Sequence, residues 1–310
     1  MKRNVCIFGA NSVLANDLIE NYSDLYEFIR IQRTNTLFLK ENNLKIKFDL
    51  SKNYTKNGIL DLVNKINKFR KSDFLVFILF AWAGKPRDLD LKHKISSKEN
   101  QNILDNFIHI SGICNPNQII FISTAGAIYN QNTDKLSKED DIPMPTSEYG
   151  IQKLMAEKIL TSYCNRHDIK LTILRIASAF GHNPLSREQG VINKWLFNIK
   201  RNEPIKIYNS LESKINFISY KHISQSIDIV LNKELTGIYN IGSNKSTSLK
   251  EILFHVKKVS KIDKLNLEYF DNKLRLFYLD TSTFQQKTNL KFQNNFLLEI
   301  KRIFSIIENY

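Results

Sequence analysis

The chain of 310 residues is long enough for one large α/β domain, or for a nucleotide-binding domain with a smaller partner. A hydrophobic fraction of 42% and a charged fraction of 25% exclude wholesale disorder. The net charge of +14 is compatible with an anionic small substrate. The basic residues are spread from Lys2 to Arg302 and form no dense tract, so we expect no nucleic-acid partner.

The cysteines and the apolar stretches indicate the compartment. Cys6, Cys114 and Cys164 lie far apart, with neither metal-binding nor redox spacing. The longest apolar stretch, Phe74 to Gly84, is much shorter than the roughly 20 residues of a membrane-spanning helix. The apolar stretch after Met1 is too short for a signal peptide. We therefore expect a cytoplasmic protein without a metal and without membrane contact.

The N-terminal half alternates short apolar runs with amphipathic stretches, a pattern typical of βαβ units around a parallel sheet. We expect strands at Val5–Phe8, Tyr26–Gln32, Lys45–Phe48, Phe74–Phe80, Gln118–Ile122 and Leu171–Ile176. We expect helices at Val13–Tyr22, Ile59–Phe69, Asn100–Ile110 and Tyr149–Tyr163. This order predicts a Rossmann-type, doubly wound parallel sheet and a dinucleotide-binding domain over residues 1–178.

The pattern changes beyond Gly181, where Asn183 and Pro184 open an irregular region. Strand-like pieces follow at Ile205–Tyr208, Asn216–Ile218 and Ile238–Ile241, with helices at Lys221–Leu231, Leu249–Val259 and Asn295–Ile307. We expect residues 179–310 to form a smaller α/β substrate lobe, with the chain recrossing between the lobes near residues 215–245.

A phosphate-binding turn is indicated where the first apolar run ends at Gly9. A strand, a glycine turn and a helix N-terminus direct free N–H groups and the helix dipole at an anion. Of a GxxGxxG spacing only Gly9 is a glycine, because Ser12 and Ala15 take the other positions. The motif alone is equally compatible with an ordinary strand–turn–helix. As a cofactor site it would use Gly9, Asn11, Ser12, Val13 and Leu14.

Two further strand ends are candidates for contacts with an adenosine group. NAD-binding sites of this type normally carry an acid at the end of the second strand, which here reads Ile31-Gln32-Arg33. Arg33 could face a 2′-phosphate, which favours NADP(H) over NAD(H), or it could be a solvated loop residue. Asp49, followed by Leu50, could accept a hydrogen bond from the adenine amine, or it could cap a helix.

A proton-transfer pair is indicated by Tyr149 and Lys153. Four residues apart on a helix, the phenol and the ammonium lie on one face. We expect Lys153 to lower the pKa of Tyr149, which could then exchange a proton with a substrate hydroxyl or carbonyl. Such a spacing is common by chance, but here it follows a strand that ends in the hydroxyls of Ser123 and Thr124.

Taken in order, these segments resemble the extended short-chain dehydrogenase/reductases, the branch of nucleotide-sugar epimerases, dehydratases and reductases. The resemblance covers nearly the whole chain. Four segments carry it in the N-terminal half: the turn at Gly9; the pair Asp49 and Leu50; the loop of Phe80, Ala81 and Trp82; and Asn100. Four more follow: the segment Ser123–Tyr129; the helix with Tyr149, Gly150, Lys153 and Glu157; the pair Leu174 and Arg175; and the segment Tyr239–Gly242. It implies an oxidoreductase of the Rossmann type that binds a nicotinamide dinucleotide and a nucleotide sugar.

Departures from the family pattern indicate which hydroxyl and which reaction to expect. The family hydroxyl usually lies four residues before Tyr129, where this chain has Ala125, so Thr124 or Ser123 would take its role, and we favour Thr124. Dehydratases of the family carry an Asp-Glu pair just after that hydroxyl. Ala125 and Gly126 stand there instead, so loss of water from the sugar is not expected.

The resemblance leaves an epimerase or a reductase. The single glycine of the fingerprint and Arg33 favour a loosely held, exchangeable NADPH, so we expect a 4-ketoreductase of a 4-keto-6-deoxy sugar linked to deoxythymidine or guanosine diphosphate. NADPH would deliver the hydride and Tyr149 the proton, and the product would feed surface polysaccharide such as lipopolysaccharide O-antigen. One alternative is a 4-epimerase with resident NAD. A second is a non-catalytic dinucleotide-binding protein.

The remaining expectations also rest on the resemblance. Lys214, with Asn216 and Phe217, lies in the region that contacts the nucleotide diphosphate in relatives. Relatives often dimerise through two helices flanking the site, here Asn100–Ile110 and Tyr149–Tyr163, so we expect a homodimer. We interpret three isolated histidines, His93, His182 and His222, as structural or solvent-facing.

Overall fold

The computed structural model describes residues 2–34, 44–84, 90–129, 132–181, 190–262 and 264–308, with the side chains of 90–95, 132–133 and 308 excepted. The chain forms two compact units. Unit 1 comprises Met1–Ile128, Pro145–Leu174 and Ile227–Ile238, and unit 2 comprises Tyr129–Met144, Arg175–Ser226 and Tyr239–Tyr310. Each unit is described by itself below.

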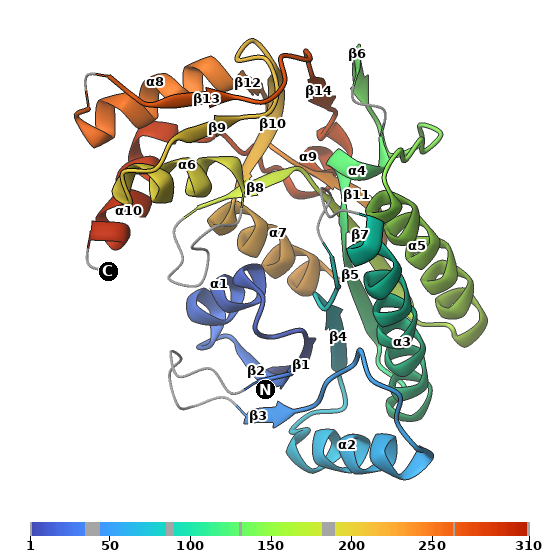
Figure 1. Ribbon diagram of the computed structural model, residues 1–310. Coiled ribbons are helices and arrows are strands. Elements are labelled where there is room, and N and C mark those ends of the chain that lie inside the picture. The colour runs from blue at the N-terminus through green and yellow to red at the C-terminus, as the bar shows by residue number, and fades with distance from the viewer. Residues whose placement is uncertain are drawn as a thin grey trace. The chain divides into compact units, whose positions relative to one another are not determined.

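A seven-stranded sheet with the order β11-β7-β5-β4-β1-β2-β3 is the centre of the Rossmann-type fold, which confirms the fold class (Figure 1). Strand β1 pairs in parallel with both β2 and β4, so the chain order reverses at β1. The strands are β1 (Arg3–Phe8), β2 (Tyr26–Gln32), β3 (Leu44–Lys47), β4 (Leu75–Leu79), β5 (Gln118–Thr124), β7 (Lys170–Ile176) and β11 (Gly237–Ile241).

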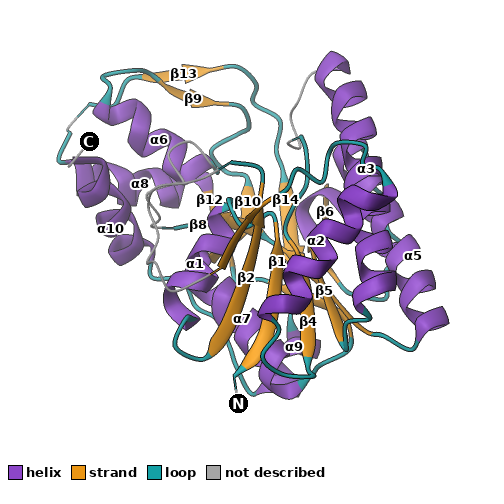
Figure 2. Ribbon diagram, turned by 90° about the horizontal axis from the view of Figure 1, so that it is seen from below, coloured by secondary structure: helices purple, strands orange, loops and turns teal. Residues whose placement is uncertain are grey.

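Helices cover both faces of this sheet (Figure 2). The face formed by Phe8, Phe77 and Phe121 packs against apolar residues of α2 (Lys56–Phe69), α3 (Asp90–Cys114) and α5 (Glu148–His167). The opposite face carries α1 (Val13–Tyr22) and the end of α7 (Tyr220–Lys233). The central strand β4 (LVFIL) is apolar on both sides, as a strand buried between two helical layers must be.

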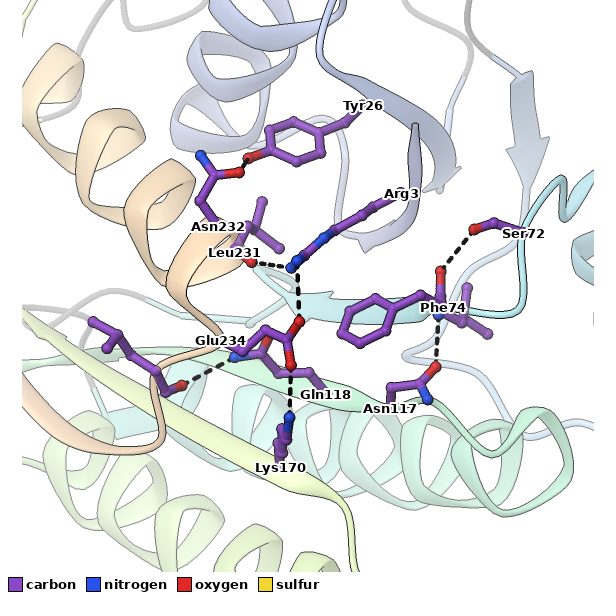
Figure 3. Close-up of polar contacts among 12 residues, drawn as sticks. Arg3, Tyr26, Ser72, Phe74, Asn117, Gln118, Lys170, Leu231, Asn232 and Glu234 are labelled. Atoms are coloured by element: carbon purple, nitrogen blue, oxygen red, sulfur yellow. Dashed lines mark hydrogen bonds and ion pairs between the residues drawn. The ribbon is translucent and has the colours of Figure 1, made fainter. Parts of the chain in front are cut away.

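A polar network ties the segment Ile227–Ile238 to the N-terminal ends of the strands (Figure 3). Arg3, which begins β1, donates to the carbonyl of Leu231 and pairs with Glu234 at 3.0 Å. Lys170, which begins β7, pairs with the other oxygen of Glu234 at 2.6 Å. Both cations therefore lie by the C-terminal end of α7, where the helix dipole favours positive charge.

Unit 2 contains its own sheets and core. Strands pair in the order β12-β10-β14-β6, with β8 also on β10, and β9 pairs with β13. Three helices pack around a core that includes Trp195, Phe217 and Phe296. The strands are β6 (Asn132–Ser137), β8 (Ser178–Phe180), β9 (Ile205–Ile207), β10 (Lys214–Ser219), β12 (Ser246–Ser248), β13 (Leu267–Tyr269) and β14 (Leu276–Leu279), and the helices are α6 (Val191–Lys200), α8 (Leu249–Ser260), α9 (Ser282–Thr288) and α10 (Phe296–Glu308).

The expected elements are present, with different bounds for several of them. Helix α1 and strand β2 begin and end where the sequence predicts, whereas α3 is longer at both ends than the predicted helix. The sequence did not predict α6, β6 or β14. None of the helices in the described part of the chain is both long and apolar enough to span a bilayer.

Candidate active site

The turn after β1 has the geometry of a phosphate-binding turn. Gly9 has a φ of +88°, and a Cβ there would lie 2.4 Å from the backbone nitrogen of Ala81. Only glycine tolerates both the positive φ and this close approach. The Ser12 hydroxyl caps α1 by accepting from the N–H of Ala15 at 3.2 Å. The helix therefore begins directly after the turn and aims its dipole there.

The loop after β4 joins the two halves of the site within unit 1. The backbone nitrogens of Phe80 and Ala81 both donate to the carbonyl of Phe8 at 2.9 Å, which fixes the loop against the Gly9 turn. The next residue, Trp82, places its ring 4.3 Å from Nζ of Lys153. Asn100 of α3 holds the loop by two hydrogen bonds with the backbone of Ala83, at 2.7 and 3.0 Å.

The end of β2 carries a buried amide that the sequence analysis did not single out. Gln32 is 1% exposed, and within the described part of the chain neither polar atom of its side-chain amide has a hydrogen-bond partner. Two residues earlier on the same side of the strand, the three guanidinium nitrogens of buried Arg30 also have no hydrogen-bond partner among the described residues. Arg33 follows and is exposed. A signal for Gln32 was available, because it occupies the strand end where the acid was sought.

Asp49 uses one carboxylate oxygen within its own turn. Its Oδ1 accepts hydrogen bonds from the backbone N–H of Ser51 at 3.1 Å and from the Ser51 hydroxyl at 2.7 Å. The following helix, α2, is capped by Thr55 instead. Leu50 is buried in the core, and its carbonyl accepts from Asn106 at 2.8 Å. The adenine contact of these two residues stays a prediction.

Tight packing at the start of α5 positions Tyr149. The Ser147 hydroxyl caps the helix by accepting from the N–H of Gly150 at 3.1 Å. A Cβ on Gly150 would lie 2.1 Å from the carbonyl oxygen of Ala127 in α4 (Ala125–Ile128). The phenol lies in this packed first turn, and burial raises the pKa of Tyr149 to about 12. The expected lowering of this pKa by Lys153 is therefore wrong, because burial of the phenol moves it in the opposite direction.

Lys153 is a buried lysine whose amine has contacts on three sides. Its Nζ donates to the carbonyl of Ile122 in β5 at 2.8 Å. The same atom lies 4.3 Å from the ring centre of Trp82 and 4.7 Å from that of Phe121, both within range of cation–π attraction. Burial lowers the pKa of Lys153 to about 7, against an opposing effect of the Glu157 carboxylate.

The two candidate hydroxyls at the end of β5 have different surroundings. Ser123 is buried, and its hydroxyl donates to Oε1 of Glu157 at 2.5 Å. Successive residues of a strand face opposite sides of the sheet, so Thr124 does not share this environment. Thr124 is half-buried at the last position of the strand. Because the Ser123 proton is already engaged, Thr124 is the better placed of the two to bind a ligand.

The remaining candidates lie in unit 2. Lys214 is the exposed first residue of β10. Asn216 is buried and exchanges hydrogen bonds with the backbone of Ser243, at 2.9 and 3.0 Å, which indicates a structural role. Phe217 belongs to the core.

The family-like residues Tyr129, Arg175 and Asn240 meet within unit 2. The Tyr129 hydroxyl accepts from Arg175 at 2.6 Å and donates to Asn240 at 2.9 Å.

The described histidines contribute to no metal site. Over the described ranges of the chain, no three His, Cys, Asp or Glu side chains are grouped to hold a metal ion. His222 stacks on Phe292 at 4.8 Å, and burial lowers its pKa. His182 and residues 183–184 lie outside the described residues, as does the side chain of His93.

The arrangement in unit 1 fits a dinucleotide. The Gly9 turn admits a phosphate close to the backbone. The Gln32 amide, for which the described residues provide no hydrogen-bond partner, lies at the neighbouring strand end. The buried indole N–H of Trp82 also lacks a partner. Buried polar groups without partners are unfavourable, so these groups are available to bind polar atoms of a ligand.

Comparisons with known proteins agree with this geometry. The model of the NAD dependent epimerase/dehydratase family matches residues 5–242. A dTDP-4-dehydro-6-deoxyglucose reductase of Escherichia coli is 34% identical over 138 residues, 44% of this chain and 43% of that protein. A putative UDP-glucose 4-epimerase of Methanocaldococcus jannaschii is 27% identical over 142 residues, 45% of this chain and 46% of that protein. The chain thus matches less than half the length of these two relatives.

The fold of this chain matches that of a solved structure over almost the full length of both. UDP-glucuronic acid 4-epimerase from Bacillus cereus, solved with UDP-glucuronic acid and NAD, superposes with a TM-score of 0.85 at 16% identity, covering 99% of each chain. This similarity establishes the shared fold.

Proposed function

Because the chain belongs to the NAD-dependent epimerase/dehydratase family, we propose that it reduces the 4-keto group of a 6-deoxy nucleotide sugar with NADPH. The sugar would be linked to deoxythymidine or guanosine diphosphate, and the product would serve surface polysaccharide synthesis. The similarity to a dTDP-4-dehydro-6-deoxyglucose reductase supports this substrate class. The observation that carries the proposal is the end of β2, where Gln32 and Arg33 replace a carboxylate.

The cofactor preference follows from charge at this strand end. A carboxylate there would accept hydrogen bonds from the two ribose hydroxyls of NAD and would repel a 2′-phosphate. Gln32 is neutral and has both a donor and an acceptor without a partner. Arg33 adds a cation that can bind phosphate through two hydrogen bonds. We propose that both residues contact the 2′-phosphate side of NADPH, an exchangeable cofactor suited to one-way reduction.

The catalytic roles follow from the groups at the ends of β5 and α5. NADPH supplies a hydride to the carbonyl carbon when it is bound. Tyr149 donates its phenolic proton to the oxygen, which becomes the new hydroxyl. Its raised pKa keeps the phenol protonated at neutral pH, as a proton donor must be. Thr124 donates a hydrogen bond to the same oxygen. Lys153 stabilises negative charge on Tyr149 and binds the nicotinamide ribose.

We also propose the roles of the two units and the oligomeric state. Unit 2 would bind the nucleotide sugar, with Lys214 contacting the diphosphate. Helices α3 and α5 pack side by side (Figure 1), and α5 exposes three apolar residues at helical spacing. These are Ile151, Met155 and Ile159. Such a stripe is unfavourable in water, and a second copy of the chain would cover it.

An absorbance assay decides between a reductase and an epimerase. It follows the oxidation of NADPH or NADH at 340 nm in the presence of a panel of 4-keto-6-deoxy nucleotide sugars. Sugar-dependent oxidation, faster with NADPH, is the expected result. The similarity to the putative epimerase of M. jannaschii supports the alternative, a 4-epimerase. It would show no net oxidation, interconvert 4-epimers without added cofactor, and release NAD when the protein is denatured. That result would overturn the proposed reductase.

A further inference from the structure

A buried carboxylate follows the two catalytic residues along one side of α5. Tyr149, Lys153 and Glu157 are spaced four residues apart, so each lies one helical turn from the next. Glu157 is only 3% exposed. An ionised group in such a position is strongly unfavourable unless it is paired and hydrogen-bonded. Its presence beside a buried lysine therefore requires an explanation.

The two charges are anchored to consecutive residues of one strand. The Lys153 ammonium donates to the backbone carbonyl of Ile122, and the Glu157 carboxylate accepts from the hydroxyl of Ser123. Ile122 and Ser123 are the two residues of β5 that directly precede its last residue, Thr124. The strand end thus fixes a cation and an anion on adjacent turns of α5, and burial strengthens the attraction between them.

Among the described residues that neighbour Lys153, one is an acid. From β5 it faces the Ile122 carbonyl and the Phe121 ring, and from the loop after β4 it faces the Trp82 ring. On its own helix the neighbouring turns carry Tyr149 and Glu157. Among these described contacts, the rings and the carbonyl cannot titrate, and the Tyr149 phenol is neutral at physiological pH. Glu157 alone supplies a compensating negative charge.

We infer that Glu157 is a positioning residue that acts through Lys153, keeping the lysine cationic and fixed against Ile122 during the reaction. Ser123 supports it by holding the carboxylate, which assigns Ser123 to this pair and leaves Thr124 to the substrate. The reaction concerned is the one proposed above, so the inference rests on that proposal for its role. The charge relationship itself can be measured without it.

The test compares Glu157→Gln with the unmodified protein. Gln retains the size of the side chain and an oxygen that accepts from Ser123, but it removes the charge. Without that charge, the pKa of Lys153 should fall by about one unit, since an opposite charge nearby typically shifts a pKa by 1–3 units. At a pH above both values, the cationic fraction of Lys153 then falls about tenfold.

Two measurements report this change. The first follows the ¹³Cε chemical shift of Lys153 against pH in protein carrying ¹³C-labelled lysine, with the signal assigned by its loss in Lys153→Arg. The second follows turnover against pH, whose alkaline limb should move to lower pH by the same amount. Glu157→Asp restores the charge and should move both back toward the original position. Thermal melting of each variant verifies that it is folded.

Glu148→Gln is the matched control, because it removes an exposed carboxylate from the first turn of the same helix. Solvent screens that charge, and the Lys153 titration should stay in place. A Lys153 titration unchanged in folded Glu157→Gln would overturn the inference, even with full reductase activity. A shifted titration in a protein that reduces no sugar would uphold the charge relationship and reject the proposed function instead.

Discussion

Gly150 lies so close to Ala127 that a Cβ on the glycine would be 2.1 Å from the alanine carbonyl oxygen. Real side chains do not approach a backbone oxygen to that distance, so a larger residue must displace α4 or the first turn of α5. Tyr149 belongs to that turn. The close contact between the two helices therefore determines where the proposed proton donor lies.

Gly150→Ala should accordingly destabilise the protein and reduce activity. We expect a loss of about 1–3 kcal/mol in the free energy of unfolding, the usual range for overpacking, measured by urea denaturation. Gly112→Ala is the control, since the nearest atom to its Cβ would be the Tyr163 hydroxyl at an ordinary 3.6 Å. That helical substitution should be neutral or stabilising by up to about 1 kcal/mol. Equal effects at both positions would contradict the packing argument.

Tyr149→Phe should abolish most turnover while NADPH still binds. The substitution removes the proton that the new hydroxyl requires, and general acids contribute about 10²–10⁴-fold. Steady-state rates and NADPH fluorescence titration measure the two effects. Tyr163→Phe on the same helix is the control, because the hydroxyl of Tyr163 has no hydrogen-bond partner. Retained turnover in Tyr149→Phe would remove Tyr149 from the mechanism.

Gln32→Asp should shift the cofactor preference from NADP(H) toward NAD(H). The new carboxylate can accept from ribose hydroxyls and repels a 2′-phosphate.

Arg33→Ser should weaken NADP(H) binding by about 10–100-fold, which corresponds to losing a charged hydrogen bond, with little change for NAD(H). Calorimetric Kd values for the two cofactors measure both effects. Arg166→Ser, an exposed arginine of α5, should change neither affinity. Parallel losses for both cofactors would contradict the assignment.

Glu234→Gln should remove a pH-dependent contribution to stability. Hydrogen bonding from Lys170, with the charges of Lys170 and Arg3, holds the pKa of Glu234 below its usual 4.5. A lowered folded-state pKa stabilises the protein above the unfolded value and ceases to do so as pH falls through the folded value. We expect a difference of up to about 1 kcal/mol at pH 7, since the pair is partly exposed. Denaturation should show a larger difference between the two proteins at pH 7 than at pH 3.

Glu212→Gln provides the comparison, because Glu212 and its partner Lys250 are both mostly exposed in their ion pair. Its substitution should alter stability little at either pH. If Glu234→Gln were as mild at pH 7, the network of Figure 3 would have no role in fixing the segment Ile227–Ile238.

Met155→Glu should dissociate the proposed homodimer. Met155 is the centre of the apolar stripe on α5 and is 55% exposed, so a carboxylate there would be buried without a partner in the dimer. Light scattering after size exclusion measures the mass. Phe254→Glu on α8 replaces an apolar residue of unit 2 that is more exposed than Met155, at 64%, and should leave the mass unchanged. An unmodified protein that is already monomeric would reject the dimer.

Local sequence patterns identified most of the Rossmann-type unit correctly. The bounds of α1 and β2 follow from apolar spacing and from a capping serine, which act within a few residues. The same reasoning missed α6, because its helical stretch follows an irregular region and its core partners are distant in sequence. Strands β6 and β14 pair with each other across more than 130 residues, and no local pattern signals such a pairing.

The sequence by itself determined the strand–turn–helix at Gly9, the spacing of Tyr149 and Lys153, and the absence of an acid after β2. The tertiary structure alone decided which groups are buried together. The Gln32 amide has no hydrogen-bond partner among the described residues, Ser123 donates to Glu157, and Lys153 is enclosed by two rings and a carbonyl. The physical reason is that spacing along a helix or strand is local. Burial and hydrogen bonding, which set charge state and availability, depend on residues brought together from distant segments.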